Sequence, residues 1–343
     1  MVLAPHCDDE TLGAAGLAMM LAAQGSPVHI VMMTNGDGFN RYALGAQHKR
    51  LRPKPEQFIQ FALRRQEETL EAVQRMGLSS SHVIFLGYPD RGLAAMWDEH
   101  WDPTRLYRSR YTLLDHSPYP NSFTPGAPFC GRSVVDDLKA IFRRLRPTHV
   151  ITSHPHDAHS DHWATYCFAV HALEELIREG ADFAGQVQVM GYLTHRGLWP
   201  RPRGYHPLLP MDPPRQYHRL PFPWVSLELP PEVVSQKYWA LMAYQSQLRF
   251  MRNYLLSFVR RSELFGVFAP LAVPRQAGGR PGLIKPDGFG SEGTLWAGPH
   301  CEVLDPVPST WAGRVRRGGE LRSVLAVSDD DFLYLRLNLG GRP

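Results

Sequence analysis

The sequence has few cysteines, and they lie far apart. Its 343 residues include four, at positions 7, 130, 167 and 301, and no two of them form a C-x-x-C pair. This spacing excludes zinc ribbons and dithiol redox motifs as first hypotheses. It gives no support for a disulfide framework either.

The sequence also lacks a long apolar run and a strong excess of charge. No apolar run approaches the roughly 20 residues that a membrane span needs, and the N-terminus has no basic segment or cleavage site of a secretory signal. We therefore expect a cytoplasmic protein with no membrane span. The formal net charge is only +4, with dispersed basic residues, so nothing requires a nucleic-acid partner. The oligomeric state is left open.

Strand-like and helix-like patterns alternate over the first 193 residues. Helical spacing of apolar residues is found at 11–24, 56–77, 133–145 and 162–180. Short apolar runs typical of buried strands are found at 1–4, 28–33, 82–86, 148–153 and 187–193. The alternation predicts a Rossmann-like α/β fold, with a mainly parallel sheet and helices on both of its faces.

The remaining segments have less regular patterns. We expect 91–132 to be an irregular insertion over the site, 198–231 an extended Pro-rich loop, and 231–258 one long amphipathic helix. A single large α/β domain is expected at 1–262. Residues 263–343 are expected to form a Gly/Pro-rich linker and a small β-rich extension with strands at 321–327 and 332–339.

Metal-binding residue types follow two of the predicted strands. His6 and Asp9 are three residues apart, and His159 and His162 repeat this spacing. The carboxyl ends of parallel strands lie at one edge of a sheet, where ligands bind. Together the two clusters can supply two histidines and an aspartate with an open fourth position, as in a catalytic zinc site. The alternative for the first cluster is acidic residues that only stabilise a helix N-terminus.

The two clusters resemble the signatures of a known family. Residues 5–10, Pro-His-Cys-Asp-Asp-Glu, resemble the Pro-His-Pro-Asp-Asp-Glu signature of the LmbE-like, or PIG-L, family of zinc-dependent de-N-acetylases. Residues 159–162, His-Ser-Asp-His, resemble its second signature, His-Pro-Asp-His. The segments 86–90 and 237–247 are also similar to the family. The resemblance spans roughly 1–260, and Cys7, which stands where the family usually has Pro, is expected to make the site sensitive to oxidants.

The resemblance implies a metal site and a reaction. His6, Asp9 and His162 would bind Zn²⁺, although such a site can also accept Fe²⁺ or Co²⁺. The implied reaction is the hydrolysis of an N-acetyl group from a glucosamine-type sugar or glycoconjugate, which would be the small-molecule partner.

The same resemblance implies the catalytic roles. Asp8 would be the general base on the water at the metal. His159 would stabilise the oxyanion and protonate the leaving amine. Asp161 would orient His159 and raise its pKa, and Asp157 is an equal alternative for this role.

Three more residues are candidates for substrate binding. Arg65 and Asp90 lie where sugar hydroxyls could be recognised, and His195 follows a predicted strand. The alternatives are an ion pair on a helix surface for Arg65, a turn residue for Asp90 and a structural histidine for His195.

Other functions remain open at this stage. The scissile bond could belong to a longer acyl amide or another conjugate, and a sugar-binding protein without catalysis is a further alternative. A non-haem iron oxygenase also uses two histidines and a carboxylate. Its usual H-x-D spacing differs from the spacing of His6 and Asp9, and oxygen chemistry would leave Asp8 without a role.

Overall fold

The computed structural model describes residues 1–38, 53–217, 223–268, 301–304, 320–328 and 333–340. The chain forms two compact units, one of residues 1–212 and 224–267 and the other of 213–223 and 268–343. The first unit extends past the boundary expected at 262, because it includes a strand at 262–267, and it excludes 213–223.

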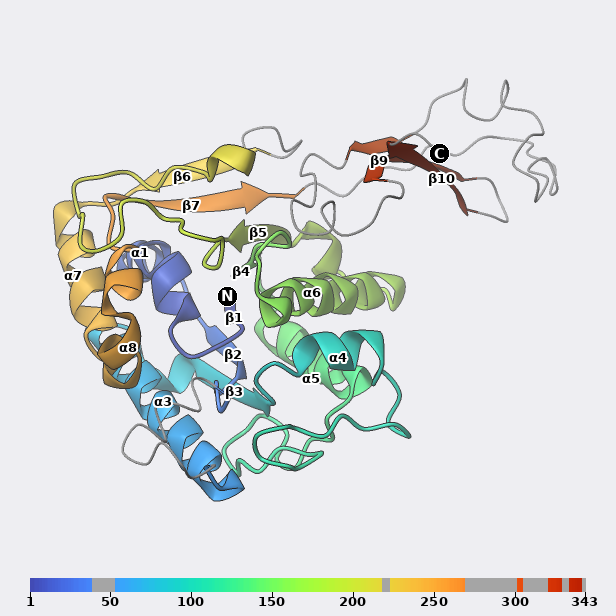
Figure 1. The fold of residues 1–343 in the computed structure, drawn as a ribbon, viewed down its shortest axis with the longest axis horizontal. Coiled ribbons are helices and arrows are strands. Elements are labelled where there is room, and N and C mark those ends of the chain that lie inside the picture. The colour runs from blue at the N-terminus through green and yellow to red at the C-terminus, as the bar shows by residue number, and fades with distance from the viewer. Residues whose placement is uncertain (39–52, 218–222, 269–300, 305–319, 329–332, 341–343) are drawn as a thin grey trace. The chain divides into compact units, whose positions relative to one another are not determined.

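A seven-stranded sheet lies at the centre of the first unit (Figure 1). Its strands are β1 (Val2–Ala4), β2 (Ile30–Thr34), β3 (Val83–Tyr88), β4 (His149–Ser153), β5 (Gln188–Tyr192), β6 (Trp224–Glu228) and β7 (Ser262–Val267). They follow the order β3-β2-β1-β4-β5-β7-β6. Strands β1 to β5 are parallel, β7 pairs antiparallel with β5, and β6 pairs antiparallel with β7. This mainly parallel sheet confirms the predicted α/β fold class.

Helices cover both faces of this sheet (Figure 1). One layer holds α1 (Asp9–Ala23), α3 (Pro55–Arg75), α7 (Pro231–Leu241) and α8 (Gln245–Leu256). The other layer holds α4 (Leu93–Asp98), α5 (Gly131–Leu145) and α6 (Ser160–Arg178). Short 3₁₀ helices are η1 (Ser80–His82), η2 (Ala184–Gln186) and η3 (Arg215–Tyr217).

Alternate residues of the central strands pack against opposite helix layers. Leu3 and Val31 belong to the core with α5 and α6, whereas Val2 and Met32 belong to the core with α1. Successive side chains of a strand point to opposite faces, so a strand covered on both sides is apolar throughout. This burial fixes the level at which each strand ends, and hence the place of the polar residues that follow it.

The helix expected at 231–258 is two helices, so that prediction is wrong. Tyr244, between α7 and α8, has a non-helical ψ of 60°. Its hydroxyl contacts Glu10, and the carboxylate of Glu68 accepts hydrogen bonds of 2.8 Å and 2.6 Å from the N–H and hydroxyl of Ser246. These contacts fix the break at Tyr244 and the start of α8.

Two other expectations need correction. The segment 198–231 is not loop throughout, because it contains the edge strand β6. The insertion at 91–132 includes α4, whose Trp97 packs against Phe168 of α6 with ring centroids 5.0 Å apart. Trp101 stacks on the same ring at 6.1 Å. The aromatic residues of the insertion therefore anchor it to the helix layer.

The described strands of the second unit are β8 (Cys301–Leu304), β9 (Glu320–Ser328) and β10 (Leu333–Gly340). They form an antiparallel sheet in the order β10-β9-β8. Strands β9 and β10 confirm the two strands predicted at 321–327 and 332–339. Among the described residues, no helix combines the length and the apolar character required to cross a membrane.

Candidate active site

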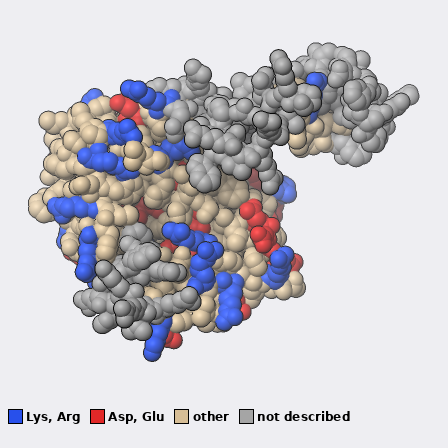
Figure 2. Space-filling model, viewed as in Figure 1, with Lys and Arg blue, Asp and Glu red and all other residues tan. Residues whose placement is uncertain are grey.

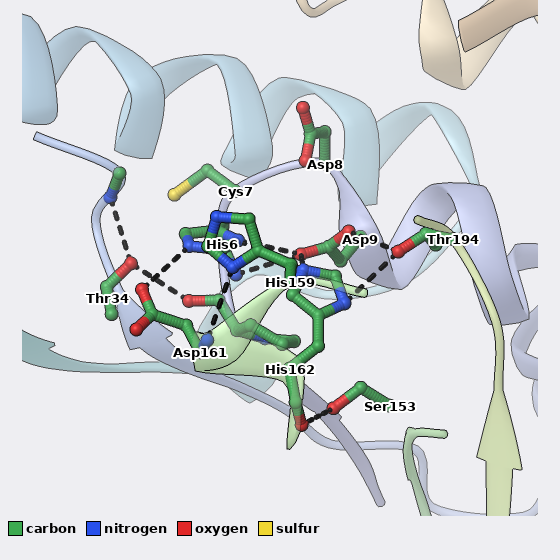
Figure 3. A network of polar contacts seen from close by, with 12 residues as sticks. His6, Cys7, Asp8, Asp9, Thr34, Ser153, His159, Asp161, His162 and Thr194 are labelled. Atoms are coloured by element: carbon green, nitrogen blue, oxygen red, sulfur yellow. Dashed lines mark hydrogen bonds and ion pairs between the residues drawn. The ribbon is translucent and has the colours of Figure 1, made fainter. Parts of the chain in front are cut away.

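Three side chains of types that can bind a metal converge where β1 and β4 end (Figure 3). The Nδ1 atom of His6 lies 3.1 Å from Asp9 Oδ2 and 3.2 Å from His162 Nε2, and the latter two atoms are 3.0 Å apart. We call these three atoms the donor triangle. Ligand atoms about 2.0–2.1 Å from a tetrahedral zinc ion lie roughly 3.3 Å from one another. The donor triangle therefore has the dimensions of one face of such a site.

Two turns bring these atoms together. His6 follows β1, and α1 begins at Asp9 after a turn in which Asp8 has a φ of 132°. His159 caps α6, because its Nδ1 accepts a hydrogen bond of 3.2 Å from the N–H of Asp161. A positive φ is costly for an aspartate and persists only where the surroundings enforce it. The site is thus built on rigid elements, with strain in the turn that carries Asp8.

The outer nitrogen of each triangle histidine faces a carboxylate. His6 Nε2 lies 3.2 Å from Asp161 Oδ2 and 3.3 Å from Asp90 Oδ1. His162 Nδ1 lies 3.4 Å from Asp157 Oδ2. Metal-binding histidines commonly donate their outer N–H to such a partner, which leaves the lone pair of the inner nitrogen for the metal. The surroundings of the triangle therefore have the same organisation as those of a metal site.

Asp157 also organises the end of β5. Its Oδ2 accepts hydrogen bonds of 2.9 Å from the backbone N–H groups of Thr194 and His195. The hydroxyl of Thr194 lies 3.1 Å from His162 Nδ1 and 3.3 Å from Asp9 Oδ1. Our sequence analysis missed Thr194, because a single threonine after a strand forms part of no motif.

The carboxylate of Asp161 supports His6 rather than the ring of His159. Besides its contact with His6, it accepts hydrogen bonds from two backbone N–H groups of the turn at 91–93. Within the described residues, Asp161 meets the ring of His159 only through its backbone N–H. The expectation that a carboxylate of Asp161 or Asp157 orients this ring is therefore wrong. The first turn of α6 directs the Asp161 side chain towards the end of β1 instead.

The charges around the donor triangle favour a cation. Burial opposes protonation of the histidines, but Asp90 and other carboxylates raise the pKa of His6 well above its ordinary value. Against the same effect of burial, Asp9 and Asp157 raise the pKa of His162 to about 9. Burial would raise the pKa of Asp9, but the two histidines hold it well below its usual range. A metal cation would satisfy the same carboxylates, so the donor set fits a metal ion.

Asp8 lies beside the donor triangle and outside it (Figure 3). The Nη2 atom of Arg65 donates to Asp8 Oδ2 at 3.3 Å and to the Cys7 carbonyl oxygen at 2.5 Å, and Nη1 donates to the Gly36 carbonyl oxygen at 3.2 Å. Burial raises the pKa of Asp8 to about 8, although the charge of Arg65 opposes the rise. A carboxyl group with such a pKa can both accept and release a proton near neutral pH.

His159 is neutral near pH 7. Burial and the charges of His6 and His162 lower the pKa of His159 to about 2, so the expected increase is wrong. Because Nδ1 accepts the N–H of Asp161, the neutral ring carries its proton on Nε2. Its centroid lies 4.8 Å from that of His6 and 5.2 Å from that of His162. The site therefore places a neutral N–H donor next to the donor triangle.

Comparison with known families agrees with this geometry. The model of the PIG-L family, described as GlcNAc-PI de-N-acetylase, matches residues 1–173. The chain belongs to the PIG-L family. The matched range includes Asp8, His159 and all three residues of the donor triangle. By its description, the family is one of de-N-acetylases, which hydrolyse an amide bond.

Solved structures with a similar fold include three that cover most of this chain. Conserved protein TT1542 from Thermus thermophilus is 21% identical, covers 79% of this chain and 94% of its own, and has a TM-score of 0.47. The 4-carboxy-2-hydroxymuconate hydratase GalB from Pseudomonas putida is 17% identical; the match covers 79% of this chain and 96% of GalB, with a TM-score of 0.49. The N,N'-diacetylchitobiose deacetylase from Pyrococcus horikoshii is 16% identical; the match covers 78% of this chain and 82% of that protein, with a TM-score of 0.44. No curated protein matches the chain.

Two of the three residues expected to bind substrate border the site of this PIG-L family member. Asp90 is buried, and its N–H donates to Asp37 Oδ1 at 2.9 Å. Although burial opposes ionisation, the charge of His6 lowers the pKa of Asp90 to about 2, whereas burial and Asp90 raise the pKa of Asp37 to about 7. Figure 2 shows acidic side chains at the floor of a hollow on this face of the first unit.

His195 and Tyr254 also border the site. The hydroxyl of Tyr254 lies 3.1 Å from His195 Nδ1, and the two rings stack with centroids 5.6 Å apart. The ring centroid of His195 is 5.4 Å from that of His159. Burial and the charge of His162 lower the pKa of His195 to about 4. Our sequence analysis identified His195 but missed Tyr254, which a helix brings in from 59 residues further along the chain.

Arg65 and Cys7 differ from the expectations. Arg65 is 2% exposed and bridges the turns at 5–10 and 34–38, so it is not part of an ion pair on the helix surface. Cys7 is fully buried, and burial raises the pKa of its thiol to about 12. The thiolate form that reacts with oxidants is therefore disfavoured at neutral pH, which argues against the expected sensitivity of Cys7.

Glu10 is a further residue of the signature with a defined contact. Its carboxylate accepts hydrogen bonds from the Asp8 N–H at 3.1 Å and from the Thr11 hydroxyl at 2.7 Å, and it contacts the Tyr244 hydroxyl. Burial raises its pKa. These contacts hold the strained turn at Asp8 against the break between α7 and α8. The PIG-L signature at 5–10 and the segment at 237–247 are thus in direct contact.

Proposed function

We propose that the protein is a metal-dependent amide hydrolase that removes an N-acetyl group from a glucosamine-type sugar or glycoconjugate. The products would be acetate and a free amine. Membership of the PIG-L family supports the reaction class. The observation that carries the proposal is the donor triangle, with His6 Nδ1, Asp9 Oδ2 and His162 Nε2 only 3.0–3.2 Å apart and Asp8 beside them.

His6, Asp9 and His162 are proposed to hold the metal, with zinc as the first choice for this donor set and iron(II) or cobalt(II) as substitutes. When bound, zinc supplies Lewis acidity, which polarises an acetyl carbonyl group and lowers the pKa of water. Asp161 and Asp90 orient His6, and Asp157 orients His162, through the outer nitrogens.

Asp8 is proposed to move the proton that the reaction requires. Its carboxylate accepts a proton from the attacking water and then releases it to the nitrogen of the leaving amine. A pKa of about 8 suits both steps, because neither protonation state is strongly disfavoured near neutral pH. Arg65 positions Asp8 through the contact at 3.3 Å.

His159 is proposed to stabilise the oxyanion as a neutral hydrogen-bond donor. It is not proposed to protonate the leaving amine, as the resemblance implied, because its pKa is lowered to about 2. Its Nε2–H group can donate to the carbonyl oxygen as negative charge develops there. Asp90 and His195 are proposed to border the sugar. Arg65 is buried, and its guanidinium holds the turns around Asp8, so we propose it as a positioning residue rather than a sugar-binding one.

The roles of Asp8 and Asp9 can be separated by one pair of variants. Asp9→Asn is expected to lose zinc, because it removes a charged corner of the donor triangle. Asp8→Asn is expected to retain a single zinc ion per chain, since Asp8 lies outside the triangle. Equilibrium dialysis followed by metal analysis measures both. Loss of zinc from Asp8→Asn, or full retention by Asp9→Asn, would contradict the assignment.

A further inference from the structure

The loop after β5 exposes several large apolar side chains. Leu198 is 62% exposed, Tyr205 48%, Leu208 85% and Leu209 41%. Leu208 has the largest exposure among the large apolar residues recorded for the described part of the chain. Isolated exposed leucines are common, but four such side chains within one short loop indicate a contact surface. We call residues 196–212 the leucine loop.

The leucine loop is held in place at several points. The N–H of Gly204 donates to the Asn253 carbonyl oxygen at 3.0 Å, and the Trp199 indole donates to the Asp212 carbonyl oxygen at 2.8 Å. The N–H of Arg261 donates to the Leu209 carbonyl oxygen at 3.1 Å. The leucines therefore lie on a loop that hydrogen bonds hold to α8 and to the residue before β7.

Positive charge accompanies these apolar residues. The leucine loop contains three arginines and one acidic residue, Asp212, and the neighbouring α8 adds Arg249 and Arg252 with no acidic residue. Arg201 and both arginines of α8 are exposed. Figure 2 shows Lys and Arg side chains over the region of α7 and α8, with few Asp or Glu side chains among them. The surface is thus apolar at its tip and basic around it.

The leucine loop also adjoins the candidate active site. It begins at Arg196, directly after His195, and the guanidinium of Arg203 lies 4.7 Å from the centroid of the Tyr254 ring. Tyr254 in turn stacks on His195. A partner held by the leucine loop would therefore lie close to the entrance of the site.

From this combination we propose that the leucine loop docks the protein on the surface of an anionic lipid bilayer. Leu208 and Leu209 enter the boundary between headgroups and acyl chains, and Tyr205 lies at the headgroup level. Arg201, with the arginines of α8, contacts the anionic headgroups. A projecting apolar tip surrounded by arginines matches the apolar acyl chains and the negative headgroups of such a bilayer. The docking does not depend on the proposed hydrolysis.

Sedimentation of the full chain with lipid vesicles tests the proposal. We expect binding to vesicles of phosphatidylcholine mixed with phosphatidylglycerol, much weaker binding to pure phosphatidylcholine, and weaker binding at high salt. The double variant Leu208→Ser/Leu209→Ser should bind at least about tenfold more weakly, since it removes the inserted apolar groups. The affinity of Arg201→Ala/Arg252→Ala for the mixed vesicles should be roughly thirtyfold lower at low salt.

Matched controls use exposed residues elsewhere in the first unit. Leu113 and Ile177 are 50% and 43% exposed, and Leu113→Ser/Ile177→Ser should bind vesicles as the unchanged protein does. Thermal melting checks that each variant is folded. Absence of binding to the mixed vesicles would overturn the proposal. Equal losses of vesicle binding in Leu208→Ser/Leu209→Ser and Leu113→Ser/Ile177→Ser would also overturn it. A dimer that Leu208→Ser/Leu209→Ser dissociates would instead assign the surface to a second copy of the chain.

Discussion

The nitrogens that face away from the donor triangle are as firmly held as those that face it. Asp161 fixes the outer nitrogen of His6 and is itself held by two backbone N–H groups. Asp157 does the same for His162, with two backbone N–H groups from the end of β5. Such partners set the ring orientation and increase the basicity of a metal ligand. Much of the affinity for a metal is therefore expected to depend on residues that do not bind it.

Asp161→Asn tests this dependence. The variant keeps the size of the side chain but removes the negative charge beside His6, so we expect its zinc affinity to fall about 10- to 100-fold. Competition with a chromogenic chelator measures the affinity. Asp136→Asn, on an exposed part of α5, is the control and should bind as the unchanged protein does. Equal affinities of the two variants would show that Asp161 has no such role.

At the scale of single residues, the sequence predicts the donor triangle better than the residues that support it. The i, i+3 spacings and the strand ends are local, and they predict that the two clusters meet. The choice of His6, Asp9 and His162 within these clusters comes from the family resemblance. The partner of His159 was predicted wrongly, because the direction of the Asp161 side chain depends on how α6 packs. Tyr254 could not be found, since only the packing of α8 brings it to His195.

Turns at the ends of β1 and β2 form the element that supports Asp8. Gly36, after β2, has a φ of 64°, and a Cβ atom there would lie 1.7 Å from Arg65 Nη1. This close approach lets Arg65 reach the carbonyl oxygens of Gly36 and Cys7 as well as Asp8. The glycine is therefore required for space as well as for its backbone conformation.

Gly36→Ala should separate these two requirements when it is compared with Gly25→Ala. Gly25 also has a positive φ, of 79°, but has nothing within 4 Å of an added Cβ. Gly25→Ala should cost only the backbone term, about 1–2 kcal/mol in the free energy of unfolding. Gly36→Ala should cost about 1–3 kcal/mol more and displace Arg65 from Asp8. Urea unfolding measures the free energy of unfolding of both variants. Equal losses of stability would contradict the claim that an added Cβ at Gly36 crowds Arg65.

Among the elements, the local patterns predict the parallel strands and their helices well. The errors lie where contacts distant in sequence decide the structure. The break at Tyr244 depends on Glu10, and the start of α8 depends on Glu68. Strand β6 is exposed in part and has no clear alternation, so only its pairing with β7 defines it.

In the whole molecule, the site is assembled from both halves of the first unit. The family match ends at residue 173, yet Thr194, His195 and Tyr254 complete the wall around the donor triangle. Tyr244 supports the signature from the same later part of the chain. Thr194, His195 and Tyr254 lie outside the two signatures at 5–10 and 159–162, whereas Tyr244 lies in the segment 237–247 that resembles the family.

The central claim is that this assembly hydrolyses an N-acetyl group. The most direct measurement is the release of primary amine from a panel of N-acetylglucosamine derivatives by the zinc-loaded protein, with Asp8→Ala as the control. We predict amine release by the unchanged protein and none by Asp8→Ala, although both hold zinc. Equal release by both proteins would contradict the role of Asp8, and no release from any derivative would contradict the proposed reaction.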